Sequence, residues 1–441
     1  MIRRRTAILV LLGFCFGLVA AGQSTASSAG HARPGLRLIS KIAAGERTTD
    51  FTFETPALGV EPRVRVILPR GYNASTRRYP VLYLLHGAVG DYRSMVENGH
   101  VDDLVGNRQM ILVMPDSGPS DGYSDWVTPA DDGPRNWRTF HLDQMIPWVD
   151  RRYRTIARRD GRALAGISMG GGGAFKYAAH RPDMFVAATS LSGALDTNEP
   201  ALQAVTGPRV YGTRAENEVL WRGDNPVDLA SNLSSVKLAL RTGNGLPGGP
   251  FGGGDAVEQV VHLLNLNMHA RLDELHIAHL WDDYGPGGHT WPYWVRGLGE
   301  TFDWTASVFA DPPAPPSRFS YRTIDTHYSD FGWEVWIKRP AIEFSRLAVR
   351  HRGRASIFGS GRARICTPPG YTPGRVLRVT LDSEQGQTTR DRLVGKRGRL
   401  CVRVKLGPGN RSQQYLPEGA GQPTVVHRAD LTLGNPAKRR R

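Results

Sequence analysis

Short apolar runs alternate with longer mixed segments through the first three quarters of the chain. The first run alternates like a half-buried strand, and the others are almost continuously apolar and bounded by Gly, Pro or Asp. Continuous apolar strands separated by helical segments are what a parallel sheet covered on both faces requires. The pattern therefore predicts an α/β fold, with strands expected at residues 64–68, 79–85, 110–114, 162–167, 185–191, 237–240 and 275–280.

Two segments between these runs are expected to be helical. Residues 255–275 have the apolar spacing of an amphipathic helix, and residues 140–150 form a shorter one. Pro147 lies in an early turn of the second segment or kinks it, because proline lacks the amide hydrogen that a helix interior needs.

A proline-rich stretch divides the chain. Residues 311–316 read Asp-Pro-Pro-Ala-Pro-Pro, which is typical of a stiff linker. Beyond it, alternating runs at residues 333–337, 376–379 and 400–404 are separated by Gly and Pro turns and indicate an antiparallel, sandwich-like domain. We expect an α/β domain over residues 36–311, a linker over residues 312–317 and a β-rich domain of unknown role over residues 318–441.

The N-terminus has the pattern of a secretory signal peptide. Three arginines are followed by an apolar run over residues 7–19 and then by small residues. A membrane anchor, the alternative, needs about 20 uninterrupted apolar residues. We expect a signal peptide over residues 1–22, a flexible leader over residues 23–35, and a secreted protein that is extracellular or associated with the cell wall.

Charge is distributed unevenly along the chain. The formal net charge is +15, and residues 316–441 hold 25 Lys and Arg against 9 Asp and Glu, so the remaining residues carry a net charge of −1. The surplus suggests an anionic partner for the C-terminal part, such as a cell-envelope polymer or an anionic lipid. A solvated surface in an arginine-rich proteome explains it equally well. We expect no nucleic-acid partner, because no recognition motif is present.

Two cysteines remain after the expected cleavage. Cys366 and Cys401 both lie on β-like runs, and an exported chain permits a disulfide between them. The sequence leaves the bond open, because it does not show how closely the two Cα atoms approach.

The clearest chemical motif is Gly166-Ile167-Ser168-Met169-Gly170, which follows an apolar run and precedes a helix-like segment. Strand, sharp turn and helix with a serine at the apex are typical of a nucleophile elbow. The glycines are needed because the turn brings the strand and the helix too close together for side chains. Ser168 is therefore the predicted nucleophile.

A serine nucleophile needs a histidine base and a carboxylate that orients it. In a fold of this kind the chain order is Ser, acid, His. His289 fits, because it lies on a glycine-rich loop after the last expected strand. Asp255 and Glu258 are both candidates for the acid, and spacing alone does not separate them. Packing or exposure accounts for four other histidines, which are His262, His269, His276 and His279.

The developing oxyanion needs two backbone amides. The residue after the nucleophile, Met169, supplies the first, and the turn after an early strand supplies the second, which is expected from Ala88. His86, in the same turn, is expected to brace the loop through hydrogen bonds. No metal or organic cofactor is expected, because no His, Cys and Asp cluster has ligand spacing.

Four separated motifs resemble one known family. Residues 81–88, residues 114–116 with 123–126, the elbow, and residues 288–294 are similar, in order, to secreted α/β-hydrolase esterases of the antigen 85 (mycolyltransferase) and esterase D type. The resemblance covers about residues 62–309. It implies an α/β-hydrolase fold, Glu258 as the triad acid because mycolyltransferases carry a glutamate early in the corresponding helix, and Trp291 as the substrate-side tryptophan beside the catalytic histidine.

The chain departs from that family at the oxyanion turn. Mycolyltransferases have an Asp where this chain has His86 and an Arg where it has Val89, and both help to hold trehalose. The resemblance therefore implies serine acyl chemistry more strongly than trehalose mycolylation. We expect a secreted serine esterase or acyltransferase acting on lipid or sugar esters of the cell envelope; the alternative is a non-catalytic surface-binding protein that works through its basic β-rich domain.

Overall fold

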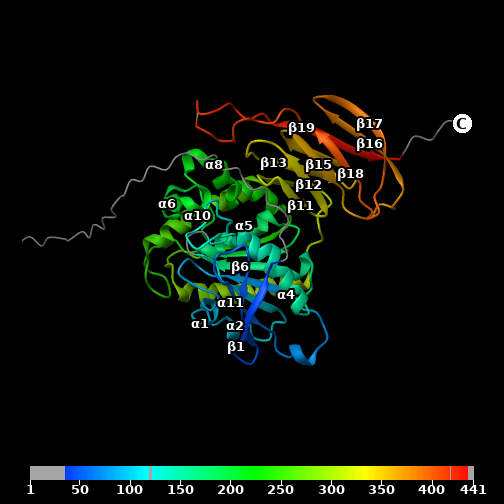
Figure 1. Ribbon diagram of the computed structural model, residues 1–441. Coiled ribbons are helices and arrows are strands. Elements are labelled where there is room, and N and C mark those ends of the chain that lie inside the picture. The colour runs from blue at the N-terminus through cyan, green and yellow to red at the C-terminus, as the bar shows by residue number, and fades with distance from the viewer. Residues whose placement is uncertain (1–34, 119–121, 418, 436–441) are drawn as a thin grey trace, which may run out of the picture.

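The computed structural model describes residues 35–118, 122–417 and 419–435 (Figure 1). The expected signal peptide and all but the last residue of the expected leader lie outside the described residues. In the described part of the chain, no helix is long and apolar enough to cross a membrane.

The larger part of the molecule is built on a nine-stranded sheet with the order β1-β2-β3-β5-β4-β6-β7-β8-β9. The first three strands pair antiparallel and β3 also runs antiparallel to β5, whereas β5, β4 and β6 to β9 are all parallel. The strands are β1 (Arg37–Ala43), β2 (Thr48–Glu54), β3 (Arg63–Ile67), β4 (Val81–Leu85), β5 (Ile111–Pro115), β6 (Arg162–Ile167), β7 (Ala187–Leu191), β8 (Lys237–Thr242) and β9 (Leu280–Asp283).

Helices cover both faces of this sheet, which explains its continuous apolar strands. Along β4, Val81, Tyr83 and Leu85 enter one apolar core, while Leu82 and Leu84 enter the other. The first core contains buried residues of α4, α5 and α10, and the second contains buried residues of α1, α2 and α11.

The helices vary widely in length. The α-helices are α1 (Ser94–Glu97), α2 (Val101–Leu104), α3 (Trp137–Thr139), α4 (Ile146–Arg152), α5 (Met169–His180), α6 (Pro200–Val205), α7 (Pro208–Tyr211), α8 (Arg214–Gly223), α9 (Pro226–Leu229), α10 (Ala256–Glu274) and α11 (Trp291–Ala310). A π-helix, η2 (Phe140–Met145), precedes α4, and short 3₁₀ turns are η1 (Tyr72–Ala74), η3 (Arg159–Gly161) and η4 (Ala230–Ser235).

The C-terminal part is all β and lies to one side of the larger sheet (Figure 1). Its antiparallel strands form a six-stranded sheet, β10-β13-β14-β19-β16-β17, and a four-stranded sheet, β11-β12-β15-β18, which share one apolar core. Their bounds are β10 (Phe319–Thr323), β11 (His327–Asp330), β12 (Trp333–Lys338), β13 (Ser345–His351), β14 (Arg354–Gly359), β15 (Arg362–Cys366), β16 (Val376–Ser383), β17 (Gly386–Leu393), β18 (Cys401–Lys405) and β19 (His427–Gly434).

The two parts are joined by hydrogen bonds at β10. The Tyr321 hydroxyl donates to the carbonyl of His180 on α5 at 2.8 Å. Asn232 of η4 donates to the carbonyl of Arg322 and accepts from the amide of Arg322, each at 2.8 Å. In the four-stranded sheet, a disulfide joins Cys366 of β15 to Cys401 of β18.

The sequence-based element prediction needs two corrections. The strand expected at residues 275–280 is wrong: α10 ends at Glu274, a turn through His276 at positive φ follows, and β9 begins only at Leu280. The helix expected at residues 140–150 is a π-helix that continues directly into α4, and Pro147 is the second residue of α4, just after the junction.

Candidate active site

Ser168 stands at the sharp turn between β6 and α5. Its backbone has φ 54° and ψ −123°, a strained conformation for a residue with a side chain. The surroundings leave no room for side chains on either side: a Cβ on Gly166 would overlap the carbonyl of Gly170, and a Cβ on Gly170 would overlap the carbonyls of Leu85 and His86. The two glycines therefore allow the close packing that the predicted elbow requires.

The structure brings Ser168, His289 and Glu258 into one hydrogen-bonded chain. His289 lies between β9 and α11, and its Nε2 is 2.8 Å from Ser168 Oγ. Its Nδ1 is 2.7 Å from Glu258 Oε2. The Trp294 ring packs edge-on against the imidazole, with the ring centres 4.8 Å apart.

Glu258 sits in the first turn of α10 and has no solvent exposure. Its second oxygen, Oε1, accepts hydrogen bonds from Ser192 Oγ at 2.8 Å, Thr242 Oγ1 at 3.1 Å and the Gly243 amide at 2.8 Å. A buried carboxylate needs such partners, because an unpaired charge is costly away from water. No sequence motif marks Ser192 or Thr242, since their contact with Glu258 depends on how neighbouring strand ends meet.

Asp255, the other acid that spacing left open, contacts main chain instead of the imidazole. Its Oδ1 accepts from the Glu258 amide at 2.8 Å and so caps α10. Its Oδ2 accepts from the His289 amide at 2.6 Å. Asp255 thus ties the start of the helix to the histidine loop, and Glu258 is the carboxylate that faces the imidazole.

The residues expected to form the oxyanion hole lie beside Ser168. Ala88 and Met169 both line the cavity that Ser168 faces. Met169 is the first residue of α5, so its amide has no helical acceptor. Within the described part of the chain, no hydrogen bond from the Ala88 amide is found either. Both amides therefore remain available to an oxygen at the reacting carbon.

His86 braces the loop that carries Ala88. It is 2% exposed, and its Nε2 accepts from the Ser117 amide at 3.0 Å, so the proton lies on Nδ1, which donates to the Gly87 carbonyl at 2.7 Å. Burial lowers the pKa of His86, which keeps the ring neutral. The Tyr123 hydroxyl adds a hydrogen bond to the His86 carbonyl at 3.0 Å.

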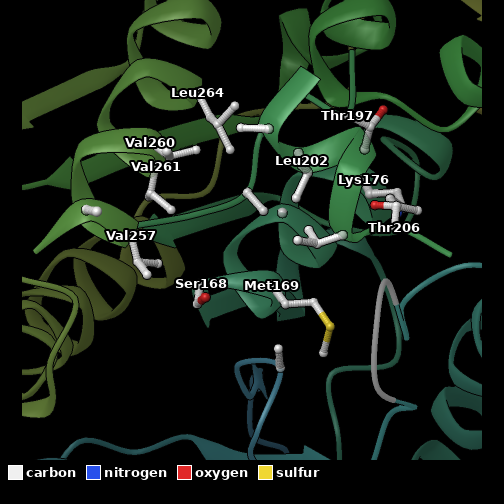
Figure 2. Close-up of a pocket in the computed structure, with 16 residues that line it drawn as sticks. Ser168, Met169, Lys176, Thr197, Leu202, Thr206, Val257, Val260, Val261 and Leu264 are labelled. Carbon is white, nitrogen blue, oxygen red and sulfur yellow. The ribbon is translucent and has the colours of Figure 1, made fainter. Parts of the chain in front are cut away.

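An apolar cavity of about 420 Å³ opens beside Ser168. Figure 2 shows one wall, where four side chains of α10 project from the same helix face at helical spacing: Val257, Val260, Val261 and Leu264. Ala201, Leu202 and Val205 of α6 also line the cavity, as do Thr197, Thr206 and the buried Lys176. The α6 part of this lining could not be predicted from the sequence, because α6 is short and carries no motif.

Trp291 lies outside the cavity beside Ser168. It is half-buried at the start of α11, its ring meets Trp294 edge-on at 5.3 Å, and it packs against the apolar core that contains α1 and α2. Trp291 is not among the residues that line the cavity. Its role in substrate binding stays a prediction.

One group of side chains in the described part of the chain has the geometry to hold a metal ion. Donor atoms of His269, Asp273 and His279 lie within 4.8 Å of one another. The two imidazoles hydrogen-bond to each other, with His269 Nδ1 2.7 Å from His279 Nε2. None of the three lines the cavity.

Comparison with known proteins identifies the family. The model of the family described as "putative esterase" matches residues 55–304, more than half of the chain. The chain belongs to this family. The matched region includes Ala88, Ser168, Glu258 and His289, and it ends within α11, before the all-β part.

Two curated relatives illustrate the range of the family. Esterase Rv1288 of Mycobacterium tuberculosis is 36% identical over 270 residues, and the match covers 58% of this chain and 58% of that protein. The chain thus spans little more than half of that relative. The diacylglycerol acyltransferase/mycolyltransferase Ag85B of Mycobacterium leprae is 29% identical over 287 residues, covering 58% of this chain and 86% of that protein.

The fold also matches a solved structure. An S-formylglutathione hydrolase from Agrobacterium tumefaciens aligns with a TM-score of 0.50 at 15% identity, covering 61% of this chain and 98% of that one. A likeness at this identity shows the fold alone. Together with the sheet order, it confirms the predicted α/β-hydrolase fold, to which the C-terminal antiparallel sheets are added.

Proposed function

We propose that the protein is a serine esterase or acyltransferase that works through an acyl-enzyme. The observation that carries the proposal is the hydrogen-bonded chain from Ser168 through His289 to the buried Glu258, placed at an apolar cavity. Membership of the putative esterase family, and relatives named as an esterase and an acyltransferase, support the same chemistry.

Each residue has a role that follows from its contacts. Ser168 Oγ attacks the ester carbonyl while His289 Nε2 takes the hydroxyl proton, and Glu258 stabilises the resulting imidazolium through Nδ1. The amides of Ala88 and Met169 stabilise the oxyanion. When the tetrahedral intermediate collapses, His289 returns the proton to the leaving alcohol and the acyl group stays on Ser168. Water or a sugar hydroxyl then attacks the acyl-enzyme and frees Ser168.

The cavity supports an ester with an apolar acyl chain as the substrate class. Its walls are mainly aliphatic, so each methylene that enters it leaves water, which is worth about 0.8 kcal/mol. That energy corresponds to about a fourfold gain in kcat/KM for each added methylene until the cavity is full. Lipid or sugar esters of a cell envelope belong to this class.

A series of p-nitrophenyl esters of increasing acyl length tests this assignment. Ala201→Phe places a ring in the cavity, whereas Ala204→Phe changes an exposed α6 residue that does not line it. We expect Ala201→Phe to lose activity on the longer esters and keep activity on the acetate, with Ala204→Phe like the native protein. Equal profiles for all three proteins would contradict the cavity as the acyl site.

The identity of the acyl acceptor is tested by product analysis. With a sugar added to the reaction, an acyltransferase gives an acylated sugar, whereas a plain esterase gives only free acid. The absence of turnover on every ester would favour a non-catalytic binding role for the all-β part, whereas turnover that does not depend on Ser168 would contradict Ser168 as the nucleophile.

We also propose that the protein is exported and acts at the cell envelope, where an anionic polymer contacts its C-terminal part. The N-terminal pattern and the cationic surplus of residues 316–441 support this proposal. Fractionation of the producing cells, with N-terminal sequencing of the mature chain, tests it. Retention of the full-length chain in the cytoplasm would overturn it.

A further inference from the structure

The outer face of the four-stranded sheet carries an ordered array of positive charges. Alternate residues of β12, β15 and β18 point into the apolar core, among them Val335, Ile365 and Val402. The residues between them point outward. Five of these outward residues are cations, and all five are exposed: Lys338, Arg362, Arg364, Arg403 and Lys405.

Strand register places these cations in two rows that run across the strands. In one row, Arg362 of β15 lies opposite Lys338 on one side and opposite Lys405 on the other. In the next row, Arg364 lies opposite Arg403. Directly opposed side chains sit about 5 Å apart, and the rows are separated by about 7 Å, two residues along each strand. We call these five residues the cationic face.

Acidic side chains do not neutralise the cationic face. Among the described residues, no ion pair joins any of its five cations to an Asp or Glu. The nearby Glu334 pairs instead with Arg399 at 3.0 Å and lies 3.2 Å from His327. Like charges placed opposite each other destabilise a sheet. The inner face of the four-stranded sheet forms the apolar core, so folding does not require the cationic face. The charges of the cationic face are therefore available to an anionic ligand.

The form of the face favours an extended anionic chain over a membrane. Surfaces that enter a bilayer combine cations with exposed apolar side chains. On the described residues of β11, β12, β15 and β18, no large hydrophobic side chain is exposed. The aromatic Trp336 is covered within its row, because His327 stacks on it at 4.9 Å and Arg364 lies 4.8 Å from its ring centre.

We propose that the cationic face binds a linear anionic polysaccharide. The repeated carboxylate or phosphate groups of the polymer pair with the arginines and lysines of successive strands. This inference rests on the proposed anionic partner and gives it a site, and it does not depend on the ester chemistry at Ser168. The disulfide between Cys366 and Cys401 ties β15 to β18 at one end of the face.

Binding of two soluble polysaccharides to the full mature chain tests the site, with polygalacturonate as the carboxylate probe and polyribosylribitol phosphate as the phosphate probe. The face variant is Arg403→Gln with Lys405→Gln. The matched control, Arg390→Gln with Arg392→Gln, removes the same charge from exposed positions on β17 of the other sheet. Unfolding temperatures and ester turnover of each variant show whether the fold and the active site are intact.

We expect the affinity of the native protein for at least one polymer to fall about a hundredfold when salt is raised from about 50 to about 200 mM, as five ionic contacts imply. The face variant should bind about tenfold more weakly at low salt, and the control within about twofold of the native protein. The face variant should also unfold at a higher temperature, because opposed like charges are removed.

Each contrary result has a separate meaning. If the native protein binds neither polymer, the proposed anionic polymer partner is wrong. If it binds but the face variant and the control weaken equally, net charge drives binding and the cationic face is not the site. If vesicles of phosphatidylglycerol bind and neither polymer does, a membrane surface replaces the polysaccharide.

Discussion

The replacement Glu258→Gln gives the sharpest test of how the candidate triad is organised. The side chain keeps its size but loses its charge and gains an NH₂ group. Three donors converge on Oε1, which are Ser192 Oγ, Thr242 Oγ1 and the Gly243 amide. The Gly243 amide can only donate a hydrogen bond, so it requires an acceptor at the Oε1 position. The glutamine carbonyl oxygen therefore occupies that position, and the NH₂ group faces His289 Nδ1.

An NH₂ group beside Nδ1 selects the wrong imidazole tautomer. Nδ1 must then accept a hydrogen bond, so the ring proton moves to Nε2, which no longer accepts the proton of Ser168 Oγ. Asparagine in place of the triad acid of a serine protease lowers kcat by about 10⁴ for the same reason. We expect a similar loss here, equivalent to about 5.5 kcal/mol of transition-state stabilisation.

The assay is p-nitrophenyl ester turnover at pH 7.5, with circular dichroism to show that the variant is folded. Asp255→Asn is the control, because the Asp255 carboxylate accepts hydrogen bonds from the Glu258 and His289 amides rather than from the imidazole. It should lose far less activity and little helix-capping stability, because asparagine caps a helix about as well as aspartate and its carbonyl oxygen still accepts from the Glu258 amide. A loss of about 10⁴ in Asp255→Asn with near-native Glu258→Gln would refute the assignment of the acid.

Three further predictions concern stability. Ser168→Gly should raise the free energy of unfolding, measured by urea denaturation, by about 1–3 kcal/mol, because glycine relieves the backbone strain at φ 54°. Ser168→Ala keeps that strain and should not raise it. Equal unfolding free energies for the two variants would show that no strain is stored at Ser168. Burial lowers the pKa of His141 to about 3, below its unfolded value of about 6.5, so the unfolded chain binds more protons between these values and stability is lost as pH falls through them. Between pH 7 and pH 5, His141 should account for about 2 kcal/mol of that loss, and His141→Gln should show a correspondingly flatter pH dependence in urea titrations. Replacing Cys366 and Cys401 by Ala opens a cross-link between residues 35 apart and should lower the unfolding free energy by about 3–4 kcal/mol, whereas an unchanged unfolding temperature would contradict that estimate.

The sequence predicted those parts of the site that local chemistry dictates. The elbow around Ser168 could be predicted from the sequence because only glycine fits at positions 166 and 170. His289 could be predicted because it follows the last strand of the sheet. Spacing could not separate Asp255 from Glu258, because both carboxylates lie at the start of α10, one as its N-cap and the other in its first turn. The resemblance to mycolyltransferases favoured Glu258, and the structure places Glu258 against the imidazole.

Other features depend on long-range packing that a single sequence does not reveal. The antiparallel strands β1 and β2 at the edge of the sheet were not expected, and β9 was placed too early because Leu275 and Ile277 continue the apolar pattern of α10. The cavity between α6 and α10 arises from segments about 50 residues apart. The cationic face requires the register of β12, β15 and β18, which composition alone cannot supply.

Intact-mass spectrometry of the protein mixed with p-nitrophenyl butyrate tests the central claim most directly. A rapidly quenched native sample should carry one butyryl group, located on Ser168 by peptide mapping, and Ser168→Ala should carry none. His289→Ala should form the adduct at least about a thousandfold more slowly, because Ser168 then lacks its base. An adduct that persists in Ser168→Ala, or ester turnover that Ser168→Ala retains, would contradict the proposed acyl-enzyme mechanism.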